Sequence, residues 1–463
     1  MAQMTKDSNI RTELFESTPI PKAVMNLAVP SVLSSLVMVI YNLADTYYVG
    51  MLNDPIQNAA VTLAAPVLLA FNAVNNLFGV GSSSMMSRAL GRKDIDTVQR
   101  SSAFGFYSAL FCGLMLSLLY TVFQNPLLVI LGSDAENITA TRQYLLWTTS
   151  CGAAPAILNV VMAYLVRAEG ASLHASLGTM SGCFLNIILD PIFILPWGLD
   201  MGAAGAGLAT FLSNCFACGY FFVLLAIKRG KTYVCINPKM FRPSKDIVKG
   251  VCGVGIPAAI QNLLNVTGMT VLNNFASAFG SDAVAAVGIA QKINMIPFQI
   301  ALGSSQGIMP LVSYNYSSGN RKRMKNAILF TSAIAVSFLT AVTIGYYFGA
   351  AGLIRMFMKT QTVVDYGTRF LRGICLALPF LCVDFIAVGV FQACGLGRLS
   401  LVFAILRKIV LEIPALYLFN KIAPLYGLVY AQPAAEVILA IAAIFVLLRL
   451  IRCPTEQRMR GNG

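Results

Sequence analysis

The chain has 463 residues, of which 57% are hydrophobic and only 11% are charged. Soluble domains carry about 25% charged residues, so a chain this poor in charge cannot cover a soluble surface. Its net charge of +14 would suit a nucleic-acid-binding protein, but the basic residues gather in short segments between apolar runs, so we expect no nucleic-acid partner.

Apolar stretches recur along the whole chain, each long enough to cross about 30 Å of hydrocarbon. A membrane β-barrel would instead show alternating segments of about ten residues. We therefore predict an all-α membrane protein whose twelve transmembrane helices lie near residues 24–50, 57–86, 101–123, 141–166, 173–196, 202–227, 250–279, 284–314, 327–349, 365–392, 399–419 and 426–448.

Lysine and arginine concentrate in alternate loops of this map. The N-terminus, the 88–100 loop, the 228–249 segment, residues 321–325 and the C-terminal tail fall on one side, together with most of the 33 basic residues. Cytoplasmic loops are the ones enriched in basic residues. This asymmetry predicts a multi-pass protein of the cell membrane (inner or plasma) with both termini in the cytoplasm.

The two halves of the chain repeat each other. Five segments of the first half have counterparts in the second, in the same order, among them Pro30 with Pro257 and LDPIFIL (189–195) with LEIPALYL (411–418). The polar 228–249 segment lies between the halves. We predict two pseudo-symmetric six-helix lobes in a V shape, an N-lobe over residues 1–235 and a C-lobe over residues 236–463, with a substrate site near the midplane where the lobes meet.

Two carboxylates of the first half stand in polar, proline-marked helices. Asp45 has Tyr41 one turn earlier, on a helix that Pro30 can kink, and Asp190 has Asn186 one turn earlier. An acid inside a membrane helix costs about 3 kcal/mol or more, so it indicates function by default. The set could bind a proton or a dehydrated Na⁺; the alternative is a buried polar network that only fixes helix packing.

The second half carries further charges within its apolar stretches. Glu412 takes the position that Asp190 holds in the first half, but Lys408 lies one turn before it, so a structural ion pair is the simpler interpretation. Asp384 and Glu436 have no basic neighbour in sequence, and cavity lining and packing are equally plausible for both. Lys292 is expected to extend to the membrane surface or to pair with an acid, and it is a weaker cavity candidate.

These motifs resemble those of the multidrug and toxic compound extrusion (MATE) family, in particular its prokaryotic DinF-like and MepA-like members. The resemblance covers essentially the whole chain. It is carried by YNLADTYYVG (41–50), the Arg88–Lys93 loop, YLVRAEG (164–170), NIILDPIFIL (186–195), GAAGAGLAT (202–210) and PLVSYNYSSGN (310–320).

The resemblance implies a cation-coupling site in the first lobe, with Pro30 as a conformational hinge. Carried over motif by motif, that site consists of Tyr41, Asp45, Asn159, Asn186, Asp190 and Thr210. Another branch of the family uses an acid in the seventh helix, where this chain has Asn265, and this departure argues against a cation site of that kind in the second lobe.

The function implied is export of small organic cations or amphiphilic drugs or metabolites by antiport with H⁺ or Na⁺, through alternating access. We expect a monomer that is not an enzyme and has no cofactor and no resident metal, although Asp45 and Asp190 could take Na⁺. The main alternative is a flippase for lipid-linked precursors, which would need cavity-facing cations, for which Lys292 and Arg407 are the few candidates.

Overall fold

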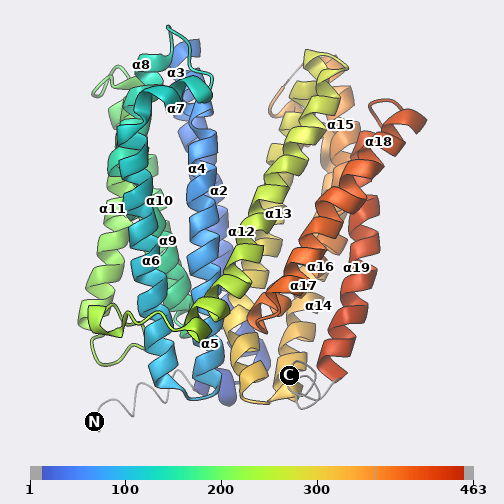
Figure 1. Ribbon diagram of the computed structural model, residues 1–463. Helices are drawn as coiled ribbons and strands as arrows, with labels where there is room; N and C mark the ends of the chain where they lie inside the picture. The colour runs from blue at the N-terminus through green and yellow to red at the C-terminus, as the bar shows by residue number, and fades with distance from the viewer. Residues whose placement is uncertain (1–12, 359, 453–463) are drawn as a thin grey trace.

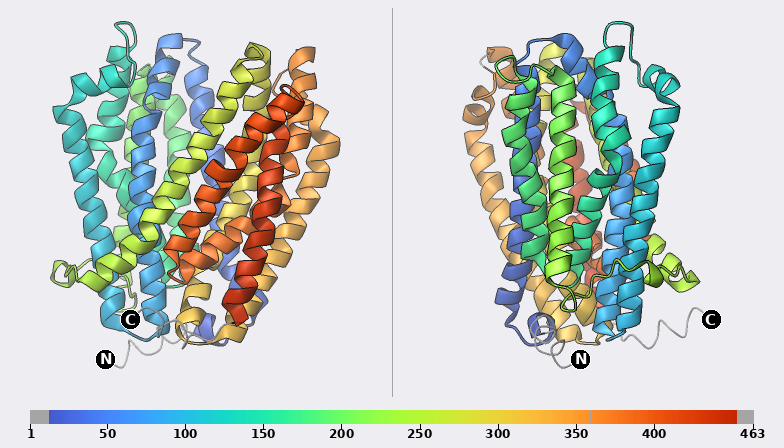
Figure 2. Two further views of the ribbon diagram at one scale, coloured as in Figure 1. Left: turned by 45° about the vertical axis from the view of Figure 1, so that its right-hand side comes forward. Right: turned by 90° about the vertical axis from the view of Figure 1, so that its left-hand side faces the viewer.

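The computed structural model describes residues 13–358 and 360–452, and the chain is helical over nearly all of this length. The helices form two bundles, one from α2 to α11 and one from α12 to α19 (Figure 1). The bundles meet at the end of the molecule where α2 begins and α19 ends, and they diverge toward the opposite end, as the turned views also show (Figure 2). The predicted all-α, two-lobed membrane architecture is confirmed.

The first bundle follows the predicted spans closely. Its helices are α2 (Ile20–Gly50), α3 (Pro55–Leu63), α4 (Ala65–Val74), α5 (Gly81–Gly91), α6 (Ile95–Val122), α7 (Gln124–Ile130), α8 (Ile138–Leu145), α9 (Ala153–Ala168), α10 (Ser172–Ile194) and α11 (Gly202–Ile227). The π-helical turns η1 (Asn75–Val80) and η2 (Leu146–Cys151) join α4 to α5 and α8 to α9. The segments from α3 to α5 therefore make one span, as do those from α8 to α9.

The second bundle begins after the polar linker, which holds the short 3-10 helix η3 (Pro238–Met240). Its elements are α12 (Lys245–Ser277), α13 (Ser281–Ser317), α14 (Arg321–Arg355), α15 (Gln361–Cys375), α16 (Leu378–Ala393), α17 (Gly397–Ile405), the π-helical η4 (Leu406–Glu412), α18 (Ile413–Ile422) and α19 (Leu428–Arg452). The helices α15 and α16 make one bent span, with an angle of 44° between them.

Nine of the helices in the described chain are long and apolar enough to cross a membrane, and eleven spans result if each of two bent pairs counts as one. The remaining predicted span (399–419) corresponds to the stretch from α17 to α18, which is not among these eleven. It carries Arg407, Lys408 and Glu412 in its η4 turn, all of them buried. The segment that least resembles a membrane helix is therefore the one with the most charge in its interior. π-Helical turns often mark functional sites in helices.

The two bundles pack backbone to backbone at the end where they meet. A Cβ atom added to Gly307 of α13 would lie 2.6 Å from the Ala28 Cα of α2, and one added to Gly255 of α12 would overlap the Leu77 carbonyl oxygen of η1. These two contacts are equivalent under the internal repeat, since α2 corresponds to α12. Small residues that let helices approach closely are a common membrane packing device, and here they join the two bundles.

Residues 13–18 reinforce this seam, although they precede the first helix of the first bundle. Phe15 is fully buried and stacks on Tyr314 of α13, and Glu16 accepts a hydrogen bond from the Tyr314 hydroxyl. The Arg323 guanidinium of α14 donates to the backbone carbonyls of Leu14, Phe15 and Thr18. We call residues 13–18 the N-terminal latch, because they tie the start of α2 to the second bundle.

Candidate cation and substrate sites

The first bundle brings together the two acids that the sequence singled out. Asp190 lies on α10 and is completely buried, and Asp45 lies on α2, close enough for the two carboxylates to interact electrostatically. The inner oxygen of Asp45, Oδ1, is enclosed and has no hydrogen-bond partner among the described residues. A buried carboxylate oxygen without a partner is costly, and it is a natural ligand for a proton or a small cation.

Asn186 and Thr210 complete one side of this cluster. The Asn186 side-chain amide can be oriented so that both its nitrogen and its oxygen have a partner. In this orientation it donates to Asp190 Oδ2 over 2.8 Å and accepts from the Thr210 backbone N–H over 3.1 Å. Tyr41 lies within hydrogen-bonding reach of the Thr210 hydroxyl and near both acids. Five of the six residues proposed from the sequence, Tyr41, Asp45, Asn186, Asp190 and Thr210, therefore lie together.

Asn159 takes a different position from the other five. Its amide donates to the Asn214 side chain over 2.7 Å, which links α9 to α11, and to the Ala156 carbonyl of its own helix over 3.3 Å. We describe it as a neighbour of the cluster that helps position α11, the helix that carries Thr210.

Tyr144 is a member of the cluster that sequence reasoning missed. It is buried on α8, near both Asp45 and Asp190. Nothing in its local pattern identifies it, because α8 is a short helix of the bent α8–α9 span, packed against α3 and α11, and only the tertiary fold brings Tyr144 near the acids of α2 and α10. Its hydroxyl adds another oxygen close to the two acids.

Pro30 lies inside α2, which runs without a break from Ile20 to Gly50. Pro30 cannot donate a backbone hydrogen bond, so the helix is weakened at this turn. Two residues earlier on the same helix, Ala28 packs against Gly307 of α13. The helix that carries Asp45 is thus weakened close to a contact with the second bundle.

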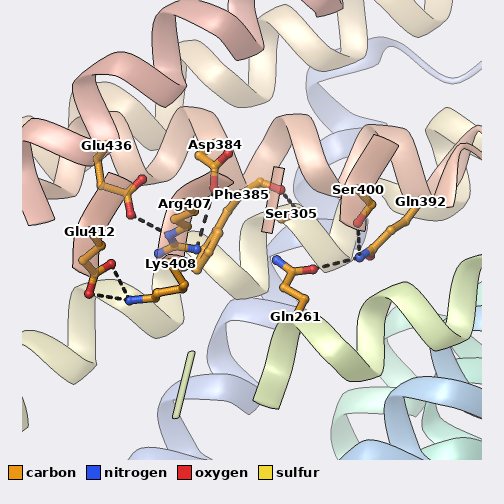
Figure 3. Close-up of polar contacts among 10 residues, drawn as sticks. All are labelled: Gln261, Ser305, Asp384, Phe385, Gln392, Ser400, Arg407, Lys408, Glu412 and Glu436. Carbon is orange, nitrogen blue, oxygen red and sulfur yellow. Dashed lines mark hydrogen bonds and ion pairs between the residues drawn. The ribbon is translucent and has the colours of Figure 1, made fainter. Parts of the chain in front are cut away.

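The charged residues of the second bundle form two adjacent groups (Figure 3). In the first group, Lys408 donates to both oxygens of Glu412, over 2.8 and 2.6 Å, as the spacing of one helical turn predicted. In the second, Arg407 Nε donates to Glu436 over 2.7 Å, and Arg407 Nη1 lies 3.6 Å from Asp384. The Arg407 guanidinium also rests on the Phe385 ring, with 4.6 Å from its central carbon to the ring centroid.

These positions show how the second-bundle acids are packed. Asp384 and Glu436 are 1% and 0% exposed and sandwich Arg407, so they lie in the bundle interior, and neither is among the residues that line the cavity bordered by α12, α13, η4 and α19. Glu412 does line that cavity, whereas Lys292 is exposed on α13 and does not. From α13 the cavity is lined by Gln291, Asn294 and Met295, among others, and the cavity role considered for Lys292 stays a prediction.

The comparison with known proteins agrees with this architecture. The MatE family profile matches twice, over residues 30–192 and 257–418, and the two matches reproduce the internal repeat that begins at Pro30 and Pro257. The chain is 33% identical over 439 residues to the multidrug export protein MepA of Staphylococcus aureus, covering 94% of both chains. It is also 33% identical to MepA of Staphylococcus haemolyticus, covering 94% of this chain and 95% of the relative.

The fold has a close counterpart among solved structures. An outward-facing multidrug resistance MATE family transporter of the MOP superfamily superimposes with a TM-score of 0.89 at 27% sequence identity, covering 95% of this chain and 97% of that one. The bundles of the present structure likewise meet at one end and diverge at the other (Figure 1).

Proposed function

The chain belongs to the MATE family of transporters, and from that membership we propose that it is a secondary active transporter that exports organic cations or amphiphilic compounds by antiport with H⁺ or Na⁺. Its relatives named above are multidrug export proteins, which supports the class of cargo. The observation that carries the coupling proposal is the pairing of the fully buried Asp190 with Asp45, whose Oδ1 has no hydrogen-bond partner within the described part of the chain.

The proposed cycle follows from the electrostatics of this pair. With both acids ionised, two negative charges face each other in a low-dielectric interior and attract a cation. Binding of a proton or Na⁺ neutralises part of that charge and weakens the hold on a cationic substrate. The same event changes the forces on α2, which is free to bend at Pro30, and the two bundles then open alternately to the two sides of the membrane.

The orientation and division of the molecule are part of the same proposal. We place both termini in the cytoplasm of a cell whose plasma or inner membrane holds the protein as a monomer, and we divide the chain into an N-lobe (1–235) and a C-lobe (236–463). The closed end of the V then faces the cytoplasm. The flippase alternative is not favoured, because Arg407 is held between two acids and Lys408 is paired with Glu412, which leaves no free cation in this group for a pyrophosphate.

The test is efflux of ethidium, an organic cation, from proteoliposomes that contain the purified protein. The imposed gradient is first a pH gradient without Na⁺ and then a Na⁺ gradient at constant pH. We expect one of the two gradients to accelerate efflux, and an ionophore that collapses this gradient to remove the acceleration. Efflux that stays unchanged when either gradient is collapsed by its own ionophore would overturn the antiport proposal.

A further inference from the structure

A further pocket lies at the end of the second bundle where the two bundles are apart. It is bordered by the end of α14, by the exposed face of α15 and by Tyr426 in the turn before α19, and its volume of about 580 Å³ is in the range of small-molecule sites. In Figure 1, α15 lies at the end of the molecule away from both termini. We call this site the arginine pocket, because Arg355, Arg369 and Arg372 line it.

The three arginines lie on the side of the membrane where the predicted spans leave few basic residues. Lysine and arginine gather in the loops of the opposite side, as is usual for loops that stay in the cytoplasm. Arg369 and Arg372 are three positions apart on α15 and therefore share one face of this helix, and Arg355 lines the same pocket from α14. Membrane topology does not account for three guanidinium groups around one pocket on this side.

Two of the arginines are held in place by aromatic rings. The Arg369 guanidinium lies over the Tyr426 ring, with 4.5 Å from its central carbon to the ring centroid, and the Arg372 guanidinium lies 5.4 Å from the Tyr347 centroid. Arg372 Nε also donates to the Tyr347 carbonyl over 2.9 Å, which leaves the Nη groups of this side chain for a ligand. An arginine that is fixed beforehand loses less conformational entropy when it binds an anion.

The positive charge of this wall is not balanced. None of the three arginines forms an ion pair with a carboxylate of the described chain. Asp365, the one acid among the described residues that line the pocket, accepts a hydrogen bond from the Gln361 amide over 2.9 Å. Three arginines and one aspartate give the wall a net charge of +2. A phosphate monoester carries about −1.5 to −2 at pH 7, so it matches this charge better than a singly charged carboxylate does.

We propose that the arginine pocket binds a phosphate monoester, whose oxygens accept hydrogen bonds from Arg355, Arg369 and Arg372. Guanidinium groups suit this ligand, because their paired N–H groups match two phosphate oxygens at once. The group that the phosphate carries can be a diacylglycerol, as in phosphatidic acid, or a small alcohol, as in a soluble phosphate ester. The pocket is separate from the Asp45–Asp190 cluster, and this inference does not depend on the proposed export function.

The test uses two phosphate monoesters, one without and one with acyl chains. Binding of sn-glycerol 3-phosphate to the full-length protein in detergent is measured by isothermal titration calorimetry, with the carboxylate D-glycerate for comparison. Binding of dioleoyl phosphatidic acid is measured by native mass spectrometry, with dioleoyl phosphatidylcholine for comparison. We expect at least one monoester to bind about tenfold more tightly than its comparison compound, because it makes an additional charge-assisted hydrogen bond.

The two monoesters also identify the source of the ligand. Binding of both shows that the phosphate group is sufficient, and binding of phosphatidic acid alone shows a lipid site; either result supports the proposal. The triple variant Arg355→Gln/Arg369→Gln/Arg372→Gln should abolish the binding. Arg355→Gln alone, at an exposed residue that ends α14, keeps the test valid if the triple variant does not fold, and it should weaken binding about tenfold.

A charge-matched control is the triple variant Arg92→Gln/Lys322→Gln/Lys325→Gln, which removes the same charge from exposed positions at the other end of the molecule and should bind like the wild type. Three results would each overturn the proposal: no binding of either monoester by the wild-type protein, binding that the arginine-pocket variants leave unchanged, or comparison compounds that bind as tightly as the monoesters. No ion gradient is applied, so a failure of ion coupling leaves these measurements unaffected, and their failure leaves the antiport proposal standing.

Discussion

Phe15 stacks on Tyr314 with 5.0 Å between ring centroids and 19° between ring planes. The Tyr314 hydroxyl also donates to Glu16, which lies 298 positions earlier in the chain. The contact joins the segment before α2 to α13 of the other bundle. It lies at the closed end of the V, where the bundles must separate if that end is to open. The N-terminal latch is therefore a stabilising element of the conformation described here.

Loss of the latch should favour opening at the closed end. Arg323→Gln removes a guanidinium that donates to three backbone carbonyls of residues 14–18. Hydrogen bonds to a charged group contribute about 1.5–3 kcal/mol each, so the open population should rise about tenfold or more. Spin labels at the exposed positions 92 and 325 would report it as a longer distance between α5 and α14.

Lys322→Gln, at the exposed neighbour of Arg323, is the matched control and should leave the distance distribution unchanged. An Arg323→Gln distribution identical to that of the wild type would show that the latch does not affect the conformational equilibrium.

Neutralising either coupling acid should abolish gradient-driven efflux while the protein stays folded. Asp190→Asn and Asp45→Asn each remove a charge from the buried pair but keep its shape. We expect transport to fall to the level of protein-free vesicles, with an unchanged elution profile in size-exclusion chromatography. Asp200→Asn provides the control, since Asp200 is exposed in the turn before α11 and adopts a positive φ of 51°, which asparagine also tolerates. Full export by both pair variants would rule out this site.

A larger side chain at the seam should hinder the closed packing of the bundles. In Gly307→Val the new Cβ would lie 2.6 Å from the Ala28 Cα, and neither backbone can move aside easily. Overpacking of this kind costs about 1–3 kcal/mol, so the midpoint temperature of unfolding should fall. Residues at the closed end should also react faster with a labelling reagent. Gly345→Val, on α14 with no atom within 4 Å of the added Cβ, is the control. Equal thermal midpoints for the two variants would contradict a close-packed seam.

Loss of Arg407 alone should destabilise the protein, whereas replacing Arg407, Asp384 and Glu436 together should be tolerated. Arg407→Met leaves Asp384 and Glu436 buried without their cation, and breaking such a group costs about 3–5 kcal/mol. We expect low yield and a lower thermal midpoint. The triple variant Arg407→Met/Asp384→Asn/Glu436→Gln removes every charge and should recover most of the loss. If the triple variant is no more stable than Arg407→Met, unpaired charge is not the cause.

The sequence alone determined the features that depend on local geometry. Long apolar runs predicted the membrane spans, because a helix must be apolar over the width of the bilayer. The pairs Asn186–Asp190 and Lys408–Glu412 could be predicted because residues four apart share one face of a helix. The repeat gave the two-bundle architecture, since the same pattern in both halves builds the same six helices.

Only the tertiary structure decided which helix faces meet. Arg407 reaches Asp384 and Glu436 from a different span, Tyr144 joins the acids from α8, and the latch crosses from the segment before α2 to α13 and α14. Asn159 pairs with Asn214 for the same reason. Apolar faces of membrane helices look alike in sequence, and the rotation of each helix is set by close packing against its neighbours. The sequence thus identified the buried charges, and the packing of the helices assigned each of them its partner.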